Sequence, residues 1–325
     1  MKVFVTGGTG NIGQNITKEL LDRGHQIVLL TRTPDRIPAY LEMPGVEVVQ
    51  GNILEHDKMA AAMEGCDAVV HIALGWGNTP TEMLNNDTRV TCFLAETAEK
   101  FGIEKMIYTS STAAMGPLRD GMDEEALLIP GDLYGSTKAS AEMYLIGFNQ
   151  FYGGQGVYSA PVKLKRNIIR PGYTFSNPIV EGGASESDTR FLDIAKAILQ
   201  NEPVKLRAGD GTQFISGRQI AKLYADLLES DLNKEIFLAL GKKFVSWEQI
   251  ARWAKEMVPE STSEIIVDDA GWDGKISYYG VAKMEKVFGL AFEGDEDLKD
   301  HVAWNVERAR KILAGEDVHN VYHVW

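Results

Sequence analysis

The chain has 325 residues, of which 44% are hydrophobic and 24% are charged, and its formal net charge is −13. This length allows one large domain or two modest ones with a sizeable core. The acidic balance argues against a nucleic-acid binder and against a protein held on an anionic membrane, because both need a basic surface. We therefore expect neither nucleic acid nor membrane among its partners.

The cysteines and the N-terminal residues indicate the compartment. Cys66 and Cys92 are too few for a disulfide framework and lack the spacing of metal ligands, so we predict two reduced thiols and no metal site. No segment reaches the roughly 18 apolar residues of a membrane span. The first strand follows Met1-Lys2 directly, without the apolar core of a signal peptide. These features predict a cytoplasmic protein.

Short apolar runs alternate with amphipathic stretches through the first half of the chain. The expected strands are 2–6, 26–30, 46–50, 68–72, 105–109 and 167–170. The expected helices between them include 12–23, 57–63, 88–100 and 136–148. This alternation predicts right-handed crossovers and a doubly wound parallel sheet, which is an α/β fold of the Rossmann type.

The pattern changes after Arg170, where prolines and glycines interrupt the chain. A helical period over 220–228, a strand over 236–240 and a polar-faced helix over 298–313 follow. We predict a dinucleotide-binding Rossmann domain made of residues 1–171 and 216–240. A smaller, discontinuous α/β substrate-binding region would consist of residues 172–215 and 241–325.

A glycine-rich stretch, Thr6-Gly7-Gly8-Thr9-Gly10-Asn11-Ile12-Gly13, joins the first strand to the first helix. A plain turn needs only one glycine, whereas a dinucleotide cradle needs one for the turn, one for the pyrophosphate and one for helix packing. No Lys-Ser/Thr pair follows, so the stretch is not a nucleoside-triphosphate loop. The predicted cofactor contacts are Gly7, Thr9, Gly10, Asn11, Ile12 and Gly13.

The end of the second strand, Leu29-Leu30-Thr31-Arg32-Thr33, bears on which dinucleotide binds. A carboxylate at this place would bond the ribose hydroxyl of NAD, and none is present. Arg32 could instead pair with a 2′-phosphate, so NADP is the preferred cofactor. The alternative is a solvated Arg32, with NAD held by main-chain contacts.

Two stretches carry groups suited to hydride-transfer chemistry. Ser111 follows the fifth strand, and Tyr134 and Lys138 share one helix face at the i, i+4 spacing. An ammonium favours the ionised form of a nearby phenol, whose reference pKa is about 10. We predict Tyr134 as acid and base, Lys138 as its partner and a ligand of the nicotinamide ribose, and Ser111 as donor to the substrate oxygen. A Tyr-x-x-x-Lys pair alone is more typical of an ordinary amphipathic helix, and the glycine-rich stretch together with the serines after the fifth strand reverses that balance.

Taken together, these motifs resemble the extended short-chain dehydrogenase/reductase family, of the NAD-dependent epimerase/dehydratase type, over most of the chain. The resemblance implies adenine contacts from the stretch containing Asn52 and Ile53, and a nicotinamide loop at Arg170-Pro171-Gly172. It also implies homodimers formed by helix packing, and substrates that are often nucleotide sugars. The further cofactor contacts predicted from these matching stretches are Asn52, Ile53, Ala73, Thr109 and Pro171.

The chain departs from the family pattern at several places. Asp87 stands where an Asn is usual, Asn52 replaces an Asp, and Met115 replaces a common Tyr. The family's phosphate-gripping arginine is missing after Gln213, which argues against a nucleotide-diphosphate sugar unless Arg218 or Arg190 substitutes. The predicted substrate contacts are Trp76, Ser111, Thr112, Tyr173 and Arg218, whereas His71, in an apolar strand, is expected to be a core histidine.

The sequence therefore favours an NAD(P)-dependent oxidoreductase acting on a carbonyl or secondary alcohol of a sugar-like or related small molecule. One alternative is a redox-neutral epimerase of a sugar or nucleotide sugar with tightly bound NAD. Another is a binding protein that senses NADP without catalysis.

Overall fold

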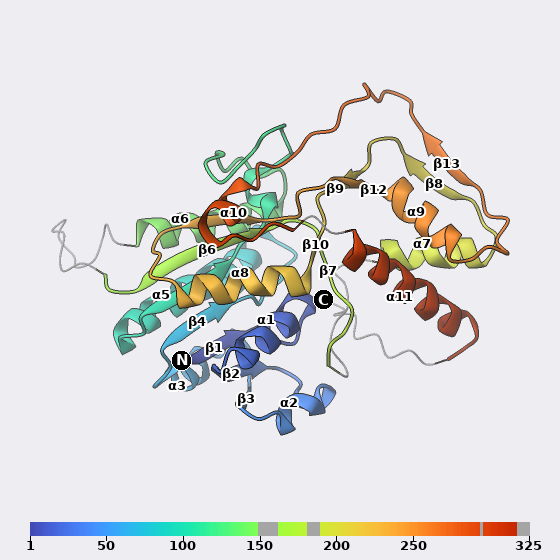
Figure 1. Ribbon diagram of the computed structural model, residues 1–325. Coiled ribbons are helices and arrows are strands. Elements are labelled where there is room, and N and C mark those ends of the chain that lie inside the picture. The colour runs from blue at the N-terminus through green and yellow to red at the C-terminus, as the bar shows by residue number, and fades with distance from the viewer. Residues whose placement is uncertain (149–161, 181–188, 293–294, 317–325) are drawn as a thin grey trace.

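The computed structural model describes residues 1–148, 162–180, 189–292 and 295–316. Its centre is a seven-stranded sheet of order β11-β6-β5-β4-β1-β2-β3, in which all neighbouring strands are parallel (Figure 1). The strands are β1 (Lys2–Thr6), β2 (Gln26–Thr31), β3 (Val46–Gln50), β4 (Ala68–His71), β5 (Lys105–Thr109), β6 (Lys165–Pro171) and β11 (Ile236–Ala239). The strand order reverses between β1 and β4, which is where ligands of such sheets bind.

Helices cover both faces of this sheet, as expected of a doubly wound fold. One apolar core packs α1 (Asn11–Asp22), α8 (Gly217–Glu229) and α10 (Ala282–Phe288) on the first face. A second core packs α3 (His56–Met63), α5 (Arg89–Phe101) and α6 (Leu133–Gly147) on the other face. The predicted Rossmann architecture is thereby confirmed.

The predicted elements agree closely with those observed, except that the segment directly before α5 is a π-helical turn. The helix expected over 88–100 begins at Arg89, after a π-helical turn, η2 (Leu84–Thr88). Shorter elements complete this half of the chain: η1 (Pro34–Arg36), α2 (Pro38–Glu42), α4 (Pro80–Met83) and η3 (Thr112–Met115). Hydrophobic periodicity does not distinguish a π-turn from an α-turn, because both continue a helical spiral.

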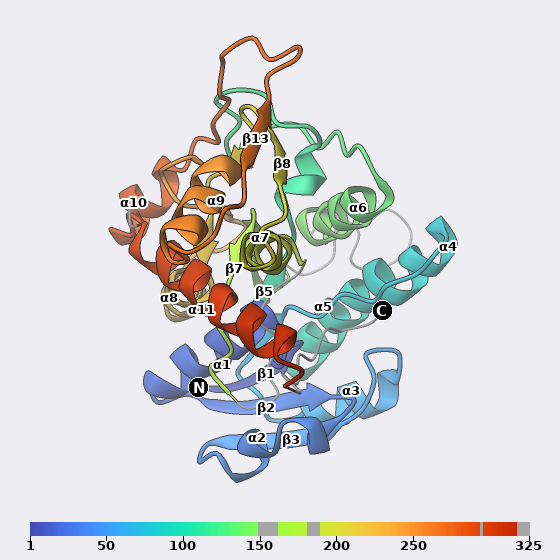
Figure 2. The ribbon, with the colours of Figure 1, turned by 90° about the vertical axis from the view of Figure 1, so that its right-hand side faces the viewer.

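A second, smaller region continues from the carboxyl end of β6. Its helices α7 (Arg190–Leu199), α9 (Trp247–Glu256) and α11 (Glu296–Leu313) lie together (Figure 2). They share an apolar core of their own that is rich in aromatic rings. Its elements are β7 (Thr174–Phe175), α7 (Arg190–Leu199), β8 (Val204–Arg207), β9 (Gly211–Thr212), β10 (Ile215–Ser216), β12 (Val245–Ser246), α9 (Trp247–Glu256), β13 (Ile265–Asp268) and α11 (Glu296–Leu313).

The division into two regions stays a proposal, and α10 is the segment that fits it least. Met284 of α10 is buried in the core formed by α1 and α8. Lys283 Nζ also donates to the main-chain oxygen of Ile236 on β11, at 2.8 Å. This helix therefore packs on the sheet, although it follows the second region in sequence.

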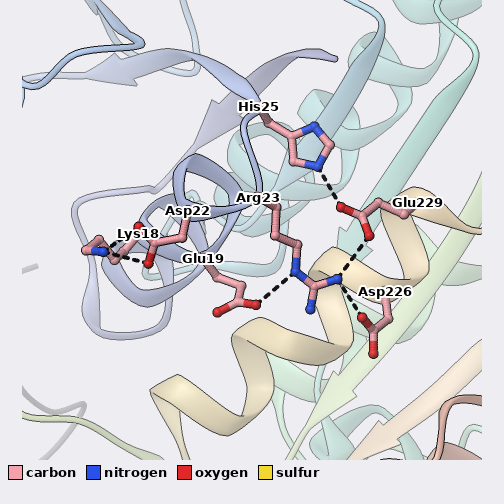
Figure 3. Close-up of polar contacts among 7 residues, drawn as sticks. All are labelled: Lys18, Glu19, Asp22, Arg23, His25, Asp226 and Glu229. Atoms are coloured by element: carbon pink, nitrogen blue, oxygen red, sulfur yellow. Dashed lines mark hydrogen bonds and ion pairs between the residues drawn. The ribbon is translucent and has the colours of Figure 1, made fainter.

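Charged side chains fasten α1 to α8 on the first face of the sheet (Figure 3). Arg23 Nε donates to Glu19 on its own helix, and its Nη1 donates to Asp226 at 2.6 Å and to Glu229 at 3.0 Å. His25 Nε2 lies 3.0 Å from the other oxygen of Glu229. The packing of these two helices is thus reinforced by a polar network at one end.

Three properties bear on the expected compartment and ligands. Both cysteines are free, with Cys66 buried and Cys92 partly so. Across the described ranges, no helix is both long and apolar enough to pass through a bilayer. Nor do three or more His, Cys, Asp or Glu side chains come together as a metal-binding group in that part of the chain.

Candidate active site

The glycines between β1 and α1 have different surroundings. Gly7 has a φ of +74°, and a Cβ there would lie 2.6 Å from the main-chain nitrogen of Ala73. A Cβ on Gly13 would collide with the carbonyl oxygen of Gly7. A Cβ on Gly10, by contrast, would meet only that oxygen, at 3.4 Å. Gly7 and Gly13 are thus required by packing, whereas Gly10 leaves one side of the turn open.

The amino end of α1 keeps main-chain donors available. Gly10 is its N-cap and provides no side-chain hydrogen bond, and the first turn has no acidic residue. The Oδ1 atom of Asn11 is buried and accepts no hydrogen bond among the described residues. Free N–H groups and a positive helix end suit a phosphate, so the residues present fit the pyrophosphate of a dinucleotide. Thr9 and Ile12 are half-buried in the same turn.

The ends of β2 and β3 lie beside this turn. Their register pairs Thr31 with Gln50, so Arg32 leaves the sheet next to the turn containing Asn52 and Ile53. Arg32 is exposed, and within the described ranges it makes no ion pair or hydrogen bond. The side chain of Asn52 accepts from the Leu54 N–H at 3.1 Å. Arg32 is therefore available to an anionic group, while Asn52 shapes its own turn.

The carboxyl ends of β4, β5 and β6 hold the remaining predicted cofactor contacts. The Thr6 hydroxyl accepts from the Ala73 N–H at 3.3 Å and fixes that segment. The hydroxyl of Thr109 is buried and bonded to the Tyr224 hydroxyl at 2.6 Å, so any contact from Thr109 would come from its main chain. Pro171 is buried at the end of β6.

Ser111 begins the turn that follows β5. It is the N-cap of η3, and its Oγ accepts from the Ala113 N–H at 3.1 Å. Because Oγ is already an acceptor in this cap, its own O–H remains to be donated elsewhere. Ser111 thus has the polarity needed to hydrogen-bond a substrate oxygen.

Tyr134 and Lys138 lie in the first turns of α6. Asp132 caps this helix by accepting from the Gly135 N–H at 2.6 Å. A Cβ on Gly135 would collide with the carbonyl oxygen of Ala113, so α6 packs tightly against the turn that begins at Ser111. The helix thereby brings all three predicted catalytic residues to one end of the sheet.

Lys138 is buried, and its surroundings are both aromatic and charged. Its Nζ lies 5.1 Å from the ring centroid of Tyr108 and 3.6 Å from Oδ2 of Asp87. His71 is a core histidine, as expected, because its ring nitrogens meet the hydroxyls of Thr6 and Thr91 at 2.7 and 3.2 Å. Burial, with a smaller effect of Lys138, lowers the pKa of His71 to about 3, so this ring is neutral.

A loop after β4 carries Trp76 toward the phenol. The Trp76 side chain is 44% exposed, and its ring centroid is 6.2 Å from that of Tyr134. A Cβ on Gly75 would collide with the carbonyl of Asn86, and the Asn86 amide donates to the Trp76 carbonyl at 2.8 Å. Gly75 therefore lets the loop pack closely against η2, and this packing places Trp76 beside Tyr134.

The other predicted substrate contacts have structural partners of their own. Thr112 opens η3 directly after Ser111. The ring of Tyr173 packs edge-on against Phe214, with centroids 4.9 Å apart, inside the aromatic core of the second region. The guanidinium of Arg218 is bonded to Asp297 on α11. Packing already accounts for Tyr173, and Arg218 would have to leave its ion pair to bind a ligand.

One buried charge cluster beside the site was missed by sequence reasoning. Arg170 on β6 makes three hydrogen bonds to Glu142 on α6, with Nη2 at 2.7 Å from Oε2, and Ser110 also donates to Glu142. Glu142 lies four residues after Lys138 on the same helix, which was the available signal. The cluster holds α6 against β6, which ends at Pro171, and against Ser110, which follows β5.

A surface hollow of about 700 Å³ lies elsewhere, against α9 and β13, and is lined by residues such as Arg252, Lys255 and Ile266. Its lining includes none of the residues proposed for catalysis or cofactor binding. It therefore does not mark the site.

Comparison with known proteins supports the interpretation of the glycine turn as part of a dinucleotide site. Residues 7–146 match a family model described as NAD(P)H-binding. Over 161 residues, the chain is 34% identical to a 3 beta-hydroxysteroid dehydrogenase/Delta 5-->4-isomerase of Mycobacterium tuberculosis, covering 46% of this chain and 43% of that protein. It is also 35% identical over 121 residues to a putative dihydroflavonol 4-reductase of Synechocystis, covering 36% of this chain and 35% of the relative. The chain spans less than half the length of these curated relatives.

Solved structures match over nearly the whole chain. The NAD complex of UDP-glucuronic acid 4-epimerase from Bacillus cereus has a TM-score of 0.78 at 18% identity, covering 96% of this chain and 99% of that one. The NAD complex of dTDP-glucose 4,6-dehydratase from Bacillus anthracis has a TM-score of 0.75 at 16% identity, covering 95% and 98%. At these identities the likeness establishes the fold.

Proposed function

We propose that this chain is an NAD(P)-dependent oxidoreductase of the extended short-chain dehydrogenase/reductase family, of the NAD-dependent epimerase/dehydratase type, because its first half matches an NAD(P)H-binding family model and a dehydrogenase. It transfers hydride at a carbonyl or secondary alcohol of a small molecule that is sugar-like or related in size. One observation supports this proposal most: Gly135 packs on the turn that begins at Ser111, which makes that turn a neighbour of the helix end that carries Tyr134 and Lys138.

Each of these residues has a defined part in the proposed reaction. Ser111 donates its free O–H to the substrate oxygen and holds it beside Tyr134. The phenol gives its proton to that oxygen during reduction and takes a proton from the alcohol during oxidation. Lys138, one helical turn further on, is the proposed partner of the phenol and ligand of the nicotinamide ribose. The nicotinamide, when bound, supplies or accepts the hydride.

The cofactor site is proposed to extend from the glycine turn to Arg32. Gly10, Asn11 and the amino end of α1 would hold the pyrophosphate. Arg32 is exposed and has no partner among the residues that the structure describes, and this supports NADP over NAD because a guanidinium pairs well with a 2′-phosphate. The segments at Asn52, Ile53, Ala73, Thr109 and Pro171 are proposed to line the rest of the dinucleotide.

Turnover of a panel of carbonyls and sugars with NADPH or NADP tests this function. Tyr134→Phe is expected to lower kcat by at least a hundredfold while cofactor affinity stays within a few fold, because only the proton-transfer group is lost. Tyr144→Phe, on the exposed side of the same helix, is the matched control. Unchanged turnover in Tyr134→Phe would show that the mechanism is wrong.

A redox-neutral epimerase is the second candidate, because the matching structures include a UDP-glucuronic acid 4-epimerase in complex with NAD. The pairing of Arg218 with Asp297 weighs against a nucleotide sugar here, since that guanidinium is not free for a diphosphate. The absorbance and dinucleotide content of the purified protein separate the two candidates. An epimerase is expected to retain about one NAD per chain through purification, whereas a reductase exchanges its cofactor.

A binding protein that senses NADP is the third candidate. It is disfavoured because the chain retains Ser111, Tyr134 and Lys138, which a protein without catalysis would not need. It would bind the cofactor without turning over any substrate.

For assembly, we propose a homodimer formed by helix packing, with a small molecule as the only other partner. The expected location remains the cytoplasm.

A further inference from the structure

Trp76 is a large apolar side chain that stays exposed beside the proposed acid and base. Its side chain is 44% exposed, and its ring centroid lies 6.2 Å from that of Tyr134, with 35° between the two ring planes. A ligand that covers an exposed indole gains free energy from the apolar surface it removes from water. A substrate whose oxygen meets the Tyr134 phenol therefore lies next to this indole.

The loop that carries Trp76 is held in place by hydrogen bonds to the helical turns that follow it. The main-chain carbonyl of Trp76 accepts from the side-chain amide of Asn86, at 2.8 Å. The Gly75 N–H donates to the buried carboxylate of Asp87, at 3.2 Å. Because both bonds fix the backbone on either side of the indole, the exposed ring has a defined place near Tyr134.

Further exposed apolar side chains belong to the loop that joins η3 to α6. Leu127 is 73% exposed and Ile129 is 52% exposed, and Leu118 is also exposed. A Cβ on Gly116 would collide with the carbonyl oxygen of Ile129, so the two arms of this loop pack together at the end of η3. Ile129 also lies only five residues before Tyr134. The turn and the helix of the proposed site are thus connected by a loop with an apolar surface.

Polar side chains near these apolar ones are already bonded within the protein. Asp120 accepts from the Tyr278 N–H at 2.9 Å. Burial raises the pKa of Tyr279, and a hydrogen bond with Thr112, the residue after Ser111, opposes that rise. A ligand rich in hydroxyl groups would have to compete for these side chains, whereas an apolar ring leaves their bonds intact.

We propose that the reacting carbonyl or alcohol belongs to a flat, uncharged and largely apolar ring system, which packs on the indole of Trp76 while Tyr134 and Ser111 hold its oxygen. Trp76 is then the specificity-determining residue of the site. Contact between an aromatic side chain and a flat ring adds a stacking contribution to the burial of apolar surface. The inference rests on the proposed function, of which it specifies the substrate class.

Isothermal titration calorimetry on the chain loaded with NADP, or with NAD if that dinucleotide binds better, tests this class. An oxidised dinucleotide cannot reduce a ketone, so ketone binding is measured without turnover. The probes are 2-tetralone, a flat bicyclic ketone; D-xylose, a sugar; and UDP-glucose, an anionic nucleotide sugar that would suit the exposed Arg119 of the loop after η3. We expect 2-tetralone to bind about tenfold or more tightly than the other two, with a negative heat-capacity change. Tighter binding of D-xylose or UDP-glucose, or no binding of 2-tetralone, would overturn the proposal.

Variants of two equally exposed indoles locate the binding. Trp76→Ala is expected to weaken 2-tetralone binding about tenfold, and Trp76→Phe, which keeps an aromatic ring, by less than about threefold. Trp272→Ala is the matched control, because Trp272 is 45% exposed and donates to the Lys275 carbonyl of its own loop, at 3.2 Å. Its affinity should equal that of the native chain. Unchanged affinity in Trp76→Ala, or an equal loss in Trp272→Ala, would contradict the assignment of Trp76.

Failure of this proposal is distinguishable from failure of the proposed function, because the titration measures binding and not hydride transfer. A native chain that turns over a sugar in a Tyr134-dependent manner, without affinity for 2-tetralone, would keep the proposed function and overturn the substrate class. A native chain that binds 2-tetralone through Trp76, but reduces neither it nor any other carbonyl, would support the apolar site and remove the proposed function.

Discussion

Gly7, Gly10 and Gly13 serve one turn for different physical reasons. Gly7 is in the left-handed region and presses on the segment at Ala73, and Gly13 presses on the Gly7 carbonyl. Gly10 has an ordinary φ of −78°, and a Cβ there would make one contact within 4 Å, with the Gly7 carbonyl oxygen at 3.4 Å. The fold needs Gly7 and Gly13, while the proposed ligand needs Gly10.

Alanine at two of these glycines should therefore separate folding from binding. Gly13→Ala is expected to cost about 1–3 kcal/mol of stability, because its Cβ collides with main-chain atoms. Gly10→Ala should change the unfolding temperature little but weaken NADPH binding about tenfold or more, because its methyl group occupies the open side of the turn. Thermal unfolding and equilibrium binding measure the two effects. Gly10→Ala that binds NADPH as tightly as the native chain would contradict the proposed cradle.

Arg32 should determine the choice of dinucleotide. Charge-assisted hydrogen bonds contribute about 1.5–3 kcal/mol each, so Arg32→Ala is expected to weaken NADP binding by at least tenfold. NAD has no 2′-phosphate, so its affinity should change less than threefold and provides the internal control. Equal affinity of the native chain for NAD and NADP in equilibrium titrations would refute the preference.

At the scale of elements, sheet and helices are held by apolar cores and reinforced by a few ionic links. The network around Arg23 joins α1 to α8 (Figure 3). Helix α1 begins at the glycine turn, and α8 carries Tyr224, whose hydroxyl is bonded to that of Thr109. Burial alone would raise the pKa of Glu229, but hydrogen bonds from His25 and Arg23 outweigh it and lower that pKa. The network should therefore depend on pH.

Arg23→Gln is expected to destabilise the chain by about 1 kcal/mol at neutral pH, a modest value because the network is partly exposed. A carboxylate with a lowered pKa adds stability above its unfolded pKa of about 4.3, and this stability is lost as pH falls through the lowered folded value. The difference from the native chain should thus shrink as the solution is acidified below about pH 4.3. Lys18→Gln, which breaks the exposed pair with Asp22, is the control and should cost less than about 0.5 kcal/mol. Denaturant unfolding at several pH values decides between these outcomes.

The sequence could predict features that depend on residues close together in the chain, and it could not predict contacts between distant residues. Apolar runs and glycine spacing predicted the strands, the first helix and the cradle, because these depend on residues close in the chain. The pairing of Arg218 with Asp297 and of Asp87 with Lys138 joins residues far apart, and periodicity carries no information on such contacts. The π-turn that buries Asp87 is local, but hydrophobic periodicity does not distinguish it from an α-turn, so the sequence predicts only a helix there.

For the whole molecule, two regions meet at the carboxyl edge of the sheet. Asn11, in the glycine turn, donates to the carbonyl of Thr174, and Asn15 donates to Ser176, both at the start of the second region. The second region is thus bonded to the proposed pyrophosphate turn. Binding of the cofactor should consequently stabilise both regions together, since the same helix, α1, serves each.

Assembly is the last property of the whole molecule that the fold lets us predict. Helix α6 presents Met143 and Tyr144, each 61% exposed, and Ile146, 40% exposed, on the side away from the sheet. Adjacent exposed apolar side chains on a helix suit an interface with a second copy, in keeping with the helix-packed dimer expected from the family.

Analytical ultracentrifugation of the native chain should give twice the chain mass. Tyr144→Glu should give the mass of a single chain with little loss of thermal stability. The introduced carboxylate is exposed in the single chain and would be buried only in the dimer interface. Ile266→Glu, at an exposed position on β13, is the control and should remain dimeric. A native chain that sediments at the single mass throughout the micromolar range would contradict the prediction.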